Sequence, residues 1–233
     1  MDFSGKHVVV TGGTGALGGA VVGRLLGGGA ACTVPYVHEA EAQRFVHRDD
    51  PNVTLVNVAD LSDEADVAKL YESAHASGPL WASIHIAGGF AMGKVADTDK
   101  AALTAQLDTN LVSCFLCCRA AVAAMRDGGR IVNVAARPGL EWRTGAGMTA
   151  YTVAKAGVAA LTVALAEEVA KQGILVNAVA PSIMDTPANR KAMPKADFDA
   201  WPKVEEVAAT ILFLASAENA VTRGAVVPVY GKA

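Results

Sequence analysis

Short runs of apolar, often β-branched residues alternate along the whole chain with longer segments of helical period. The apolar runs predict strands at 7–11, 32–36, 53–58, 82–87, 130–134, 175–179 and 225–229. Several runs, such as Val8-Val9-Val10, lack the in–out alternation of a half-exposed strand, which is typical of strands buried on both faces of a parallel sheet. The intervening segments predict helices at 16–28, 38–47, 62–77, 98–126, 149–171 and 203–217.

This alternation predicts an α/β fold: a Rossmann-type, doubly wound parallel sheet of about seven strands, flanked by helices on both faces. No stretch resembles a linker, so residues 1–233 are predicted to form a single domain. The least regular segment is 182–202, which contains Pro187 and Pro194. It predicts a loop or a short helical lid.

The composition and net charge of the chain argue against several classes of protein. Hydrophobic residues make up 52% of the chain and charged residues 18%, which excludes a disordered tail. A net charge of −3 and 6% aromatic residues argue against a nucleic-acid partner. No basic-then-apolar leader begins the chain, and no unbroken apolar run of about 18 residues is present, so no membrane span is expected.

Three of the four cysteines, Cys114, Cys117 and Cys118, lie close together on one predicted helix. Their spacing could hold a metal, but the sequence shows no second cysteine pair or nearby histidine to complete a ligand set. We therefore predict no metal site and interpret the thiols as small buried hydrophobic residues. Unpaired thiols fit a reducing compartment, so a cytoplasmic location is expected.

A glycine-rich turn follows the first strand and precedes the first helix. Gly13, Gly15 and Gly18 fit the pattern G-x-G-x-x-G in that context. A pyrophosphate binds well at a helix N-terminus, and a side chain at the tight turn would block its approach. A plain turn in a glycine-rich protein is the alternative. The turn predicts a dinucleotide site that uses Gly12, Thr14, Ala16, Leu17 and Gly18.

The acidic residue expected at the end of the second strand is missing, and Tyr36 occupies its position. An acid there accepts a hydrogen bond from the 2′-hydroxyl of NAD and repels the 2′-phosphate of NADP. His38 could approach a phosphate, although no arginine is adjacent. The strand therefore favours NADP(H), with NAD(H) as the alternative.

The same turn also matches Thr-Gly-x-x-x-Ala-x-Gly, and Tyr151-Thr152-Val153-Ala154-Lys155 follows far downstream. With these motifs the chain resembles the short-chain dehydrogenase/reductase family over essentially its whole length. Further motifs of that family follow in order, at Asp60-Leu61, Ala87-Gly88, Asn110 and 181–186. The resemblance implies an NAD(P)-dependent oxidoreductase acting on a small-molecule substrate. It implies cofactor contacts at Tyr36, His38, Asp60, Leu61, Ala87, Gly88, Gly89, Tyr151, Lys155, Pro181, Ile183 and Thr186.

The expected chemistry rests on Tyr151 and Lys155, which are four positions apart and share one helical face. A nearby ammonium should lower the tyrosine pKa, so that Tyr151 can exchange a proton with a substrate oxygen or nitrogen. The resemblance further implies that Lys155 holds the nicotinamide ribose and that Asn110 positions a water that relays the proton.

The chain departs from the family after the fifth strand, where a catalytic serine is replaced by Ala136, or by Ala135 if the register slips. That serine donates to the reacting oxygen, a contact worth a few kcal/mol in comparable oxyanion sites. Thr144 and Thr149 are alternative donors, although Thr149 should face away from Tyr151 on a helix. The alanine and the Ala-Gly-Gly-Phe run at 87–90 are similar to dihydropteridine reductases, which reduce an imine-like pterin without a serine.

The substrate pocket is expected to be apolar, lined by Phe90, Met92, Ala136, Trp142, Met148 and Met184. We therefore predict an oxidoreductase that acts on a small carbonyl or imine-like compound. The alternative is a catalytically weakened homologue that keeps the dinucleotide site for a binding or regulatory role. The resemblance also implies a homotetramer or homodimer, built through the helices at 98–126 and 149–171.

Overall fold

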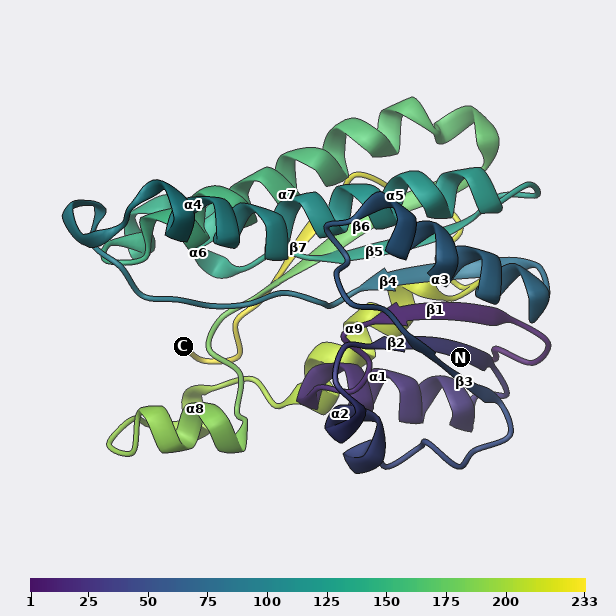
Figure 1. Ribbon diagram of the computed structural model, residues 1–233, viewed down its shortest axis with the longest axis horizontal. Helices are drawn as coiled ribbons and strands as arrows, with labels where there is room; N and C mark the ends of the chain where they lie inside the picture. The colour runs from purple at the N-terminus through teal and green to yellow at the C-terminus, as the bar shows by residue number, and fades with distance from the viewer.

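Seven parallel strands form one sheet in the order 3-2-1-4-5-6-7, in a computed structural model that describes residues 1–233 (Figure 1). The order reverses between β1 and β4, as in a Rossmann-type fold. All seven predicted strands are confirmed, although β4 begins two residues before its predicted start. The strands are β1 (His7–Thr11), β2 (Ala31–Tyr36), β3 (Val53–Asn57), β4 (Leu80–His85), β5 (Gly129–Val134), β6 (Ile174–Pro181) and β7 (Val226–Val229).

The helices cover both faces of the sheet, with α1 and α9 on one face and α3, α5 and α7 on the other (Figure 1). The short helix α6 was not predicted, because only four residues form it. The helices are α1 (Ala16–Gly27), α2 (Glu39–Arg44), α3 (Glu64–Ala76), α4 (Lys100–Leu107), α5 (Ser113–Ala124), α6 (Arg137–Leu140), α7 (Thr149–Glu168), α8 (Pro187–Ala192) and α9 (Val204–Ala215).

Alternate side chains of each central strand supply two hydrophobic cores. All five residues of β1 are buried, as the unbroken apolar run predicted. Val8 and Val10 pack with α1 and α9, whereas Val9 packs with α3, α5 and α7. The period of two along a strand explains the division, since neighbouring side chains point to opposite faces.

The long helix predicted at 98–126 is interrupted. α4 ends at Leu107, a π-helical turn spans Asp108–Val112, and α5 begins at Ser113. The buried Asn110 lies within this turn, where its side chain binds the backbone of another loop. A π-helical turn often marks a functional position, and the apolar period that predicted one helix does not reveal it.

Two helical segments, Lys100–Ala124 and Thr149–Glu168, are apolar and long enough to cross a membrane by length and composition alone. Within the fold, α5 packs on β4 and α7 packs on β6. Burial of one face against the sheet accounts for their apolar character.

The irregular segment at 182–202 contains α8, so the prediction of a short helix is confirmed. Thr186 caps this helix by accepting a hydrogen bond from the Asn189 amide at 3.2 Å. An ion pair between Arg190 and Asp185, 2.6 Å apart, joins the helix to the loop before it. A lid role for α8 stays a prediction.

Candidate active site

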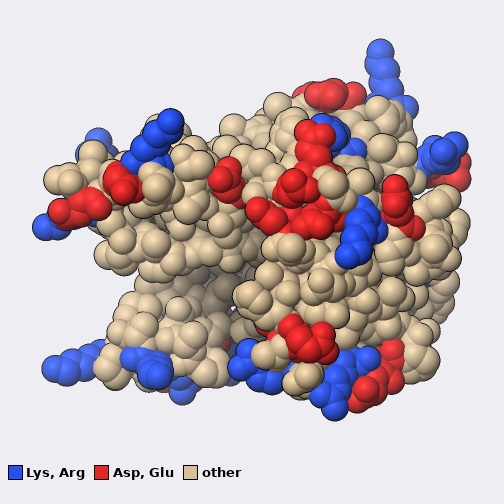
Figure 2. Space-filling model, viewed as in Figure 1, with Lys and Arg blue, Asp and Glu red and all other residues tan.

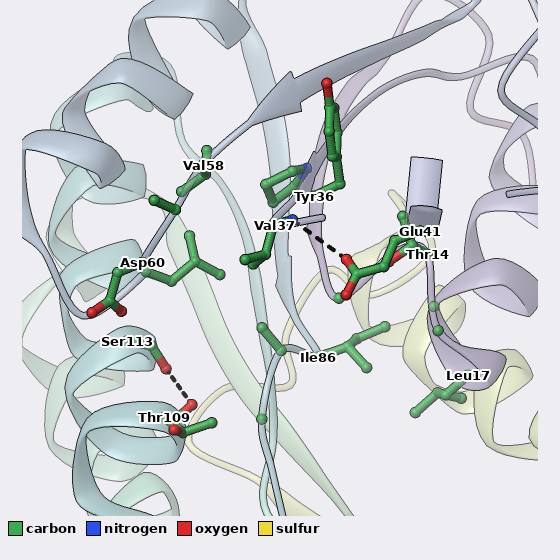
Figure 3. A pocket seen from close by; sticks show the side chains of 18 of the residues that line it. Thr14, Leu17, Tyr36, Val37, Glu41, Val58, Asp60, Ile86, Thr109 and Ser113 are labelled. Atoms are coloured by element: carbon green, nitrogen blue, oxygen red, sulfur yellow. Dashed lines mark hydrogen bonds between the residues drawn. The ribbon is translucent and has the colours of Figure 1, made fainter. Parts of the chain in front are cut away.

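A groove of about 420 Å³ crosses the carboxyl ends of β1 to β4, where the strand order reverses (Figure 3). It brings together ten of the residues that the sequence assigns to the cofactor. They are Gly12, Thr14, Ala16, Leu17, Gly18, Tyr36, Asp60, Leu61, Ala87 and Gly88. His38, Gly89, Pro181, Ile183 and Thr186 do not line this groove.

The glycines of the first turn have different physical roles. A Cβ on Gly12 would lie 2.7 Å from the Ala87 amide nitrogen, and Gly12 has a positive φ of 69°, so packing and backbone both require glycine. A Cβ on Gly18 would overlap the Gly12 carbonyl oxygen. At Gly15, by contrast, the closest atom would be 3.4 Å away, so packing does not explain the glycine.

Gly15 lines the groove and caps α1, and no side chain accepts a hydrogen bond from the first turn of that helix. The free amides and the absence of a side chain at Gly15 form a cradle that fits a pyrophosphate. The groove therefore fits the dinucleotide that the sequence predicts.

Other lining residues were not singled out from the sequence. Val58 and Ile86 form apolar walls one residue beyond their strands, and Thr109 and Ser113 come from the π-helical turn and the start of α5. The Ser113 hydroxyl donates to the Thr109 carbonyl at 2.7 Å (Figure 3). Glu41, from α2, is also on the wall. The strand ends could have indicated Val58 and Ile86, but no pattern marks the other three.

α7 carries the two central residues of the predicted chemistry. Lys155 is buried, and its Nζ donates to the Val134 carbonyl at 2.8 Å. Burial lowers the pKa of Lys155 to about 8, against an opposing effect of the Cys114 thiol. Lys155 can therefore lose its proton near the alkaline end of the physiological range.

The expected low pKa of Tyr151 is not present in this structure. Burial raises the pKa of Tyr151 to about 12. The Lys155 Nζ lies 6.0 Å from the centre of the Tyr151 ring, and the Phe90 ring packs edge-on against Tyr151 at 5.0 Å. Desolvation by these apolar surroundings exceeds any stabilisation of tyrosinate by the ammonium.

Asn110 fastens the loop that follows β4. Its Nδ2 donates to the Gly89 carbonyl at 2.9 Å, and its Oδ1 accepts from the Gly89 amide at 3.2 Å. A Cβ on Gly88 would lie 2.7 Å from Asn110 Oδ1 and 3.3 Å from Lys155 Nζ. The structure thus brings Asn110 and Lys155 together on the same side of Gly88, where a side chain would otherwise lie.

No side-chain hydroxyl occupies the position of the absent serine. Ala136 is buried and caps α6, and Ala135 pairs with β6 through its amide. Thr144 is exposed, and its hydroxyl donates to the Glu141 carbonyl at 2.8 Å. Thr149 is the exposed first residue of α7. Neither threonine hydrogen-bonds to Tyr151.

The predicted substrate residues lie on three loops, and three of the six are exposed. Phe90, Met92 and Trp142 have exposed fractions of 59%, 67% and 72%. Met148 lies where its loop bridges to Gly93, next to Met92. Met184 differs, because it is half-buried and packs against the hydrophobic core beside α1 and α9. Figure 2 shows a deep hollow between the region of α4 and α6 and that of α8. Its walls are uncharged, the tip beside α4 and α6 carries acidic and basic side chains, and the tip beside α8 carries basic ones.

A histidine does lie beside the cysteines, contrary to the sequence expectation. Ligand atoms of His85, Cys114 and Cys118 lie within 4.8 Å of one another. Both nitrogens of the His85 ring are already hydrogen-bonded, Nδ1 to Asn133 Oδ1 at 2.8 Å and Nε2 to Ser83 Oγ at 2.9 Å. His85 is thus a buried, hydrogen-bonded core residue.

Comparisons with known proteins agree with this site. A family model described as short chain dehydrogenase matches residues 6–197. Galactitol 2-dehydrogenase of Rhizobium johnstonii is 36% identical, with 97% of this chain and 94% of that protein covered. The 2,3-dihydroxy-2,3-dihydro-p-cumate dehydrogenase of Pseudomonas putida is 32% identical, with 99% and 95% covered. A crystallised blue fluorescent protein from a metagenomic library, in complex with NADPH, has a TM-score of 0.90 at 28% identity, with 100% and 99% covered.

The sheet order, the groove at its reversal point and the Tyr151–Lys155 pair agree with a match that spans most of the chain. On these grounds the protein belongs to the short-chain dehydrogenase/reductase family of NAD(P)-dependent oxidoreductases.

Proposed function

We propose that the protein reduces, or reversibly oxidises, a small and largely apolar carbonyl or imine-like substrate. The arrangement of Tyr151, Lys155 and Asn110 around the loop at Gly88 carries this proposal. The bound nicotinamide cofactor supplies or accepts the hydride. The cradle at Gly15 and the groove beyond it would hold its pyrophosphate and adenosine, while Ile183 and Thr186 would lie at the nicotinamide end.

Tyr151 is the proton donor in reduction. Its high pKa keeps the phenol protonated at neutral pH, so its hydroxyl can donate to a substrate oxygen or nitrogen. As the proton leaves, the Lys155 ammonium on the same helix face stabilises the tyrosinate. Lys155 would also hold the nicotinamide ribose. Asn110 fixes the loop beside Lys155, and we retain for it the positioning of a relay water.

The residues of the site favour an apolar substrate that needs few hydrogen-bond donors from the protein. Phe90, Met92 and Trp142 offer exposed apolar surface on the loops around Tyr151, which an apolar substrate would cover. Reduction of a carbonyl develops negative charge on oxygen, for which the serine normally donates. Reduction of a protonated imine develops no anion, so the absence of a serine hydroxyl at Ala136 raises the activation free energy less for an imine than for a carbonyl. This supports imine-like chemistry of the dihydropteridine reductase type, whereas the relatives' names span a polyol and a dihydrodiol.

A second function is favoured by Ala136 alone: a homologue that binds dinucleotide but turns over slowly. Two measurements distinguish the enzyme from the binding homologue. The first follows the absorbance of NADH and NADPH in the presence of quinones, diketones, cyclic imines and quinonoid pterins, and the second measures the binding of both cofactors by calorimetry. Turnover of any substrate class supports the enzyme. Tight cofactor binding with no turnover across the panel supports the alternative.

The second strand by itself admits NADP(H), because Tyr36 stands where an acid would repel a 2′-phosphate. We also propose a homodimer or homotetramer. The half-exposed Phe115 of α5 and Val153 and Val163 of α7 support a helix-mediated interface, which light scattering at micromolar concentration would test. A cytoplasmic location is proposed from the four buried, unpaired cysteines.

A further inference from the structure

A carboxylate reaches the adenosine end of the groove from a helix rather than from the second strand. Glu41, on α2, is half-buried and lines the groove. Its Oε2 accepts a hydrogen bond from the Val37 amide at 3.3 Å, directly after the end of β2 (Figure 3). This contact holds the side chain against the strand end where Tyr36 replaces the expected acid.

The charges on the groove wall all have one sign. Among the residues that line it, Glu41 and Asp60 are acidic, and none is lysine, arginine or histidine. In Figure 3, Glu41 lies on the wall that carries Thr14, and Asp60 lies on the wall that carries Ser113. Asp60 Oδ1 accepts from both the amide and the hydroxyl of Ser62 at 2.7 Å. Glu41 Oε1 makes no hydrogen bond within the protein, so it can accept one from a ligand.

We propose that Glu41 is the residue that selects the dinucleotide, and that it makes NAD(H) the preferred cofactor. Its carboxylate would accept a hydrogen bond from the adenosine ribose 2′-hydroxyl. A 2′-phosphate would face that carboxylate with no cation on the wall to offset the repulsion, and like charges placed together in a binding site are strongly unfavourable. The proposal rests on the dinucleotide site described above, and it reverses the preference for NADP(H) that Tyr36 alone indicated.

The nearest basic candidates do not supply the absent cation. Arg44 lines an adjoining depression that shares Thr14, Gly15 and Ala16 with the groove and also contains Glu205. The Arg44 Nε donates to the Ala40 carbonyl at 3.0 Å. His38 is exposed and lies off the groove. Neither side chain is among those that line the groove beside Glu41.

The test is equilibrium binding by calorimetry, which does not depend on turnover. The ligands are NAD⁺ and NADP⁺, with 5′-AMP and adenosine 2′,5′-bisphosphate as fragments that differ by the 2′-phosphate. Wild-type protein is expected to bind the ligand without the 2′-phosphate at least tenfold more tightly in each pair. Glu41→Gln keeps an acceptor for the Val37 amide but removes the charge, so it should lower that ratio about tenfold. Glu41→Arg should reverse the preference.

Glu39→Gln is the control on the same helix, because it makes the same charge change at an exposed position that contacts Tyr36 but does not line the groove. It should lower the ratio clearly less than Glu41→Gln does, and Arg44→Gln should leave the ratio unchanged. The proposal is overturned if wild type prefers the 2′-phosphate, if Glu41→Gln keeps the wild-type ratio, or if Glu39→Gln shifts it equally. If none of the four ligands binds, the dinucleotide site itself fails. If all bind with a ratio insensitive to Glu41, only this inference fails. Unchanged thermal midpoints verify that each variant is folded.

Discussion

The chain lacks an expected polar side chain at two places, after β2 and after β5, and the structure treats the two differently. After β2, Glu41 reaches back from α2 to the end of the strand. After β5, Ala136 leads directly into α6, and the nearby Thr144 hydroxyl bonds to its own loop. A carboxylate is thus supplied from another element in the first region, and no hydroxyl is supplied in the second.

The difference reflects how closely each role is tied to position. Repulsion of a phosphate needs a charge within several ångströms, so a side chain from a neighbouring helix can supply it. A donor to a reacting oxygen must lie within about 3 Å of that atom, which few other positions can satisfy. A residue that discriminates between cofactors can therefore come from a neighbouring element, whereas a donor to the reacting oxygen cannot easily be replaced from elsewhere.

The largest expected effect concerns the catalytic region. Tyr151→Phe should lower kcat about 10²- to 10⁴-fold, because it removes the only phenol placed for proton transfer. Calorimetric cofactor affinity should stay within about threefold of wild type, since the ring and its packing on Phe90 remain. A variant that retains a tenth of wild-type turnover would show that another group transfers the proton.

Ala136→Ser restores the absent hydroxyl. If the site is a carbonyl reductase weakened by the alanine, kcat on simple ketones should rise by up to about 10²-fold. If it is built for imine-like substrates, turnover of those substrates should change by less than about threefold. Parallel kinetics on one ketone and one cyclic imine separate the two, and Ala135→Ser is the control for register.

The two glycines of the first turn sharpen the description of the cofactor region. Gly15→Ala should keep or slightly raise the thermal midpoint, because its φ of −81° suits alanine, and should weaken dinucleotide binding about tenfold. Gly18→Ala should instead lower stability by about 1–3 kcal/mol, since its Cβ meets the Gly12 carbonyl. Denaturant unfolding and calorimetry measure both. Equal binding losses without instability would contradict the distinction.

The smallest expected effect is a pH dependence. In reduction, kcat/KM should fall as pH rises through about 8, because Lys155 then loses the proton that stabilises tyrosinate. Its pKa is lowered from 10.5, so burial of the ammonium costs stability below about pH 8, and that cost disappears as pH rises from 8 to 10.5. Lys155→Met should remove this rise in unfolding free energy. If the unfolding free energy of the variant rises by the same amount over this pH range, the rise belongs to another titratable group.

Much of the fold follows from local pattern, but several parts of the site do not. The apolar runs predicted every strand, because a parallel strand that is buried on both faces consists of consecutive apolar residues. The π-helical turn at Asp108–Val112 was not predicted, since no local pattern marks it and the contact that Asn110 makes within it is with Gly89, in another loop. The pKa of Tyr151 was expected to be low, because spacing shows that Lys155 shares its face but not that apolar neighbours desolvate the phenol.

The strand–helix alternation, the glycine cradle and the Tyr151–Lys155 spacing follow from the sequence, because each depends on residues that are close together in the chain. Only the three-dimensional packing shows which carboxylate lines the groove, which histidine lies beside the cysteines, and that the Thr144 hydroxyl bonds within its own loop. These features depend on contacts between side chains that are far apart in the sequence. Which of these side chains meet is set by the packing of the fold and not by the local sequence pattern.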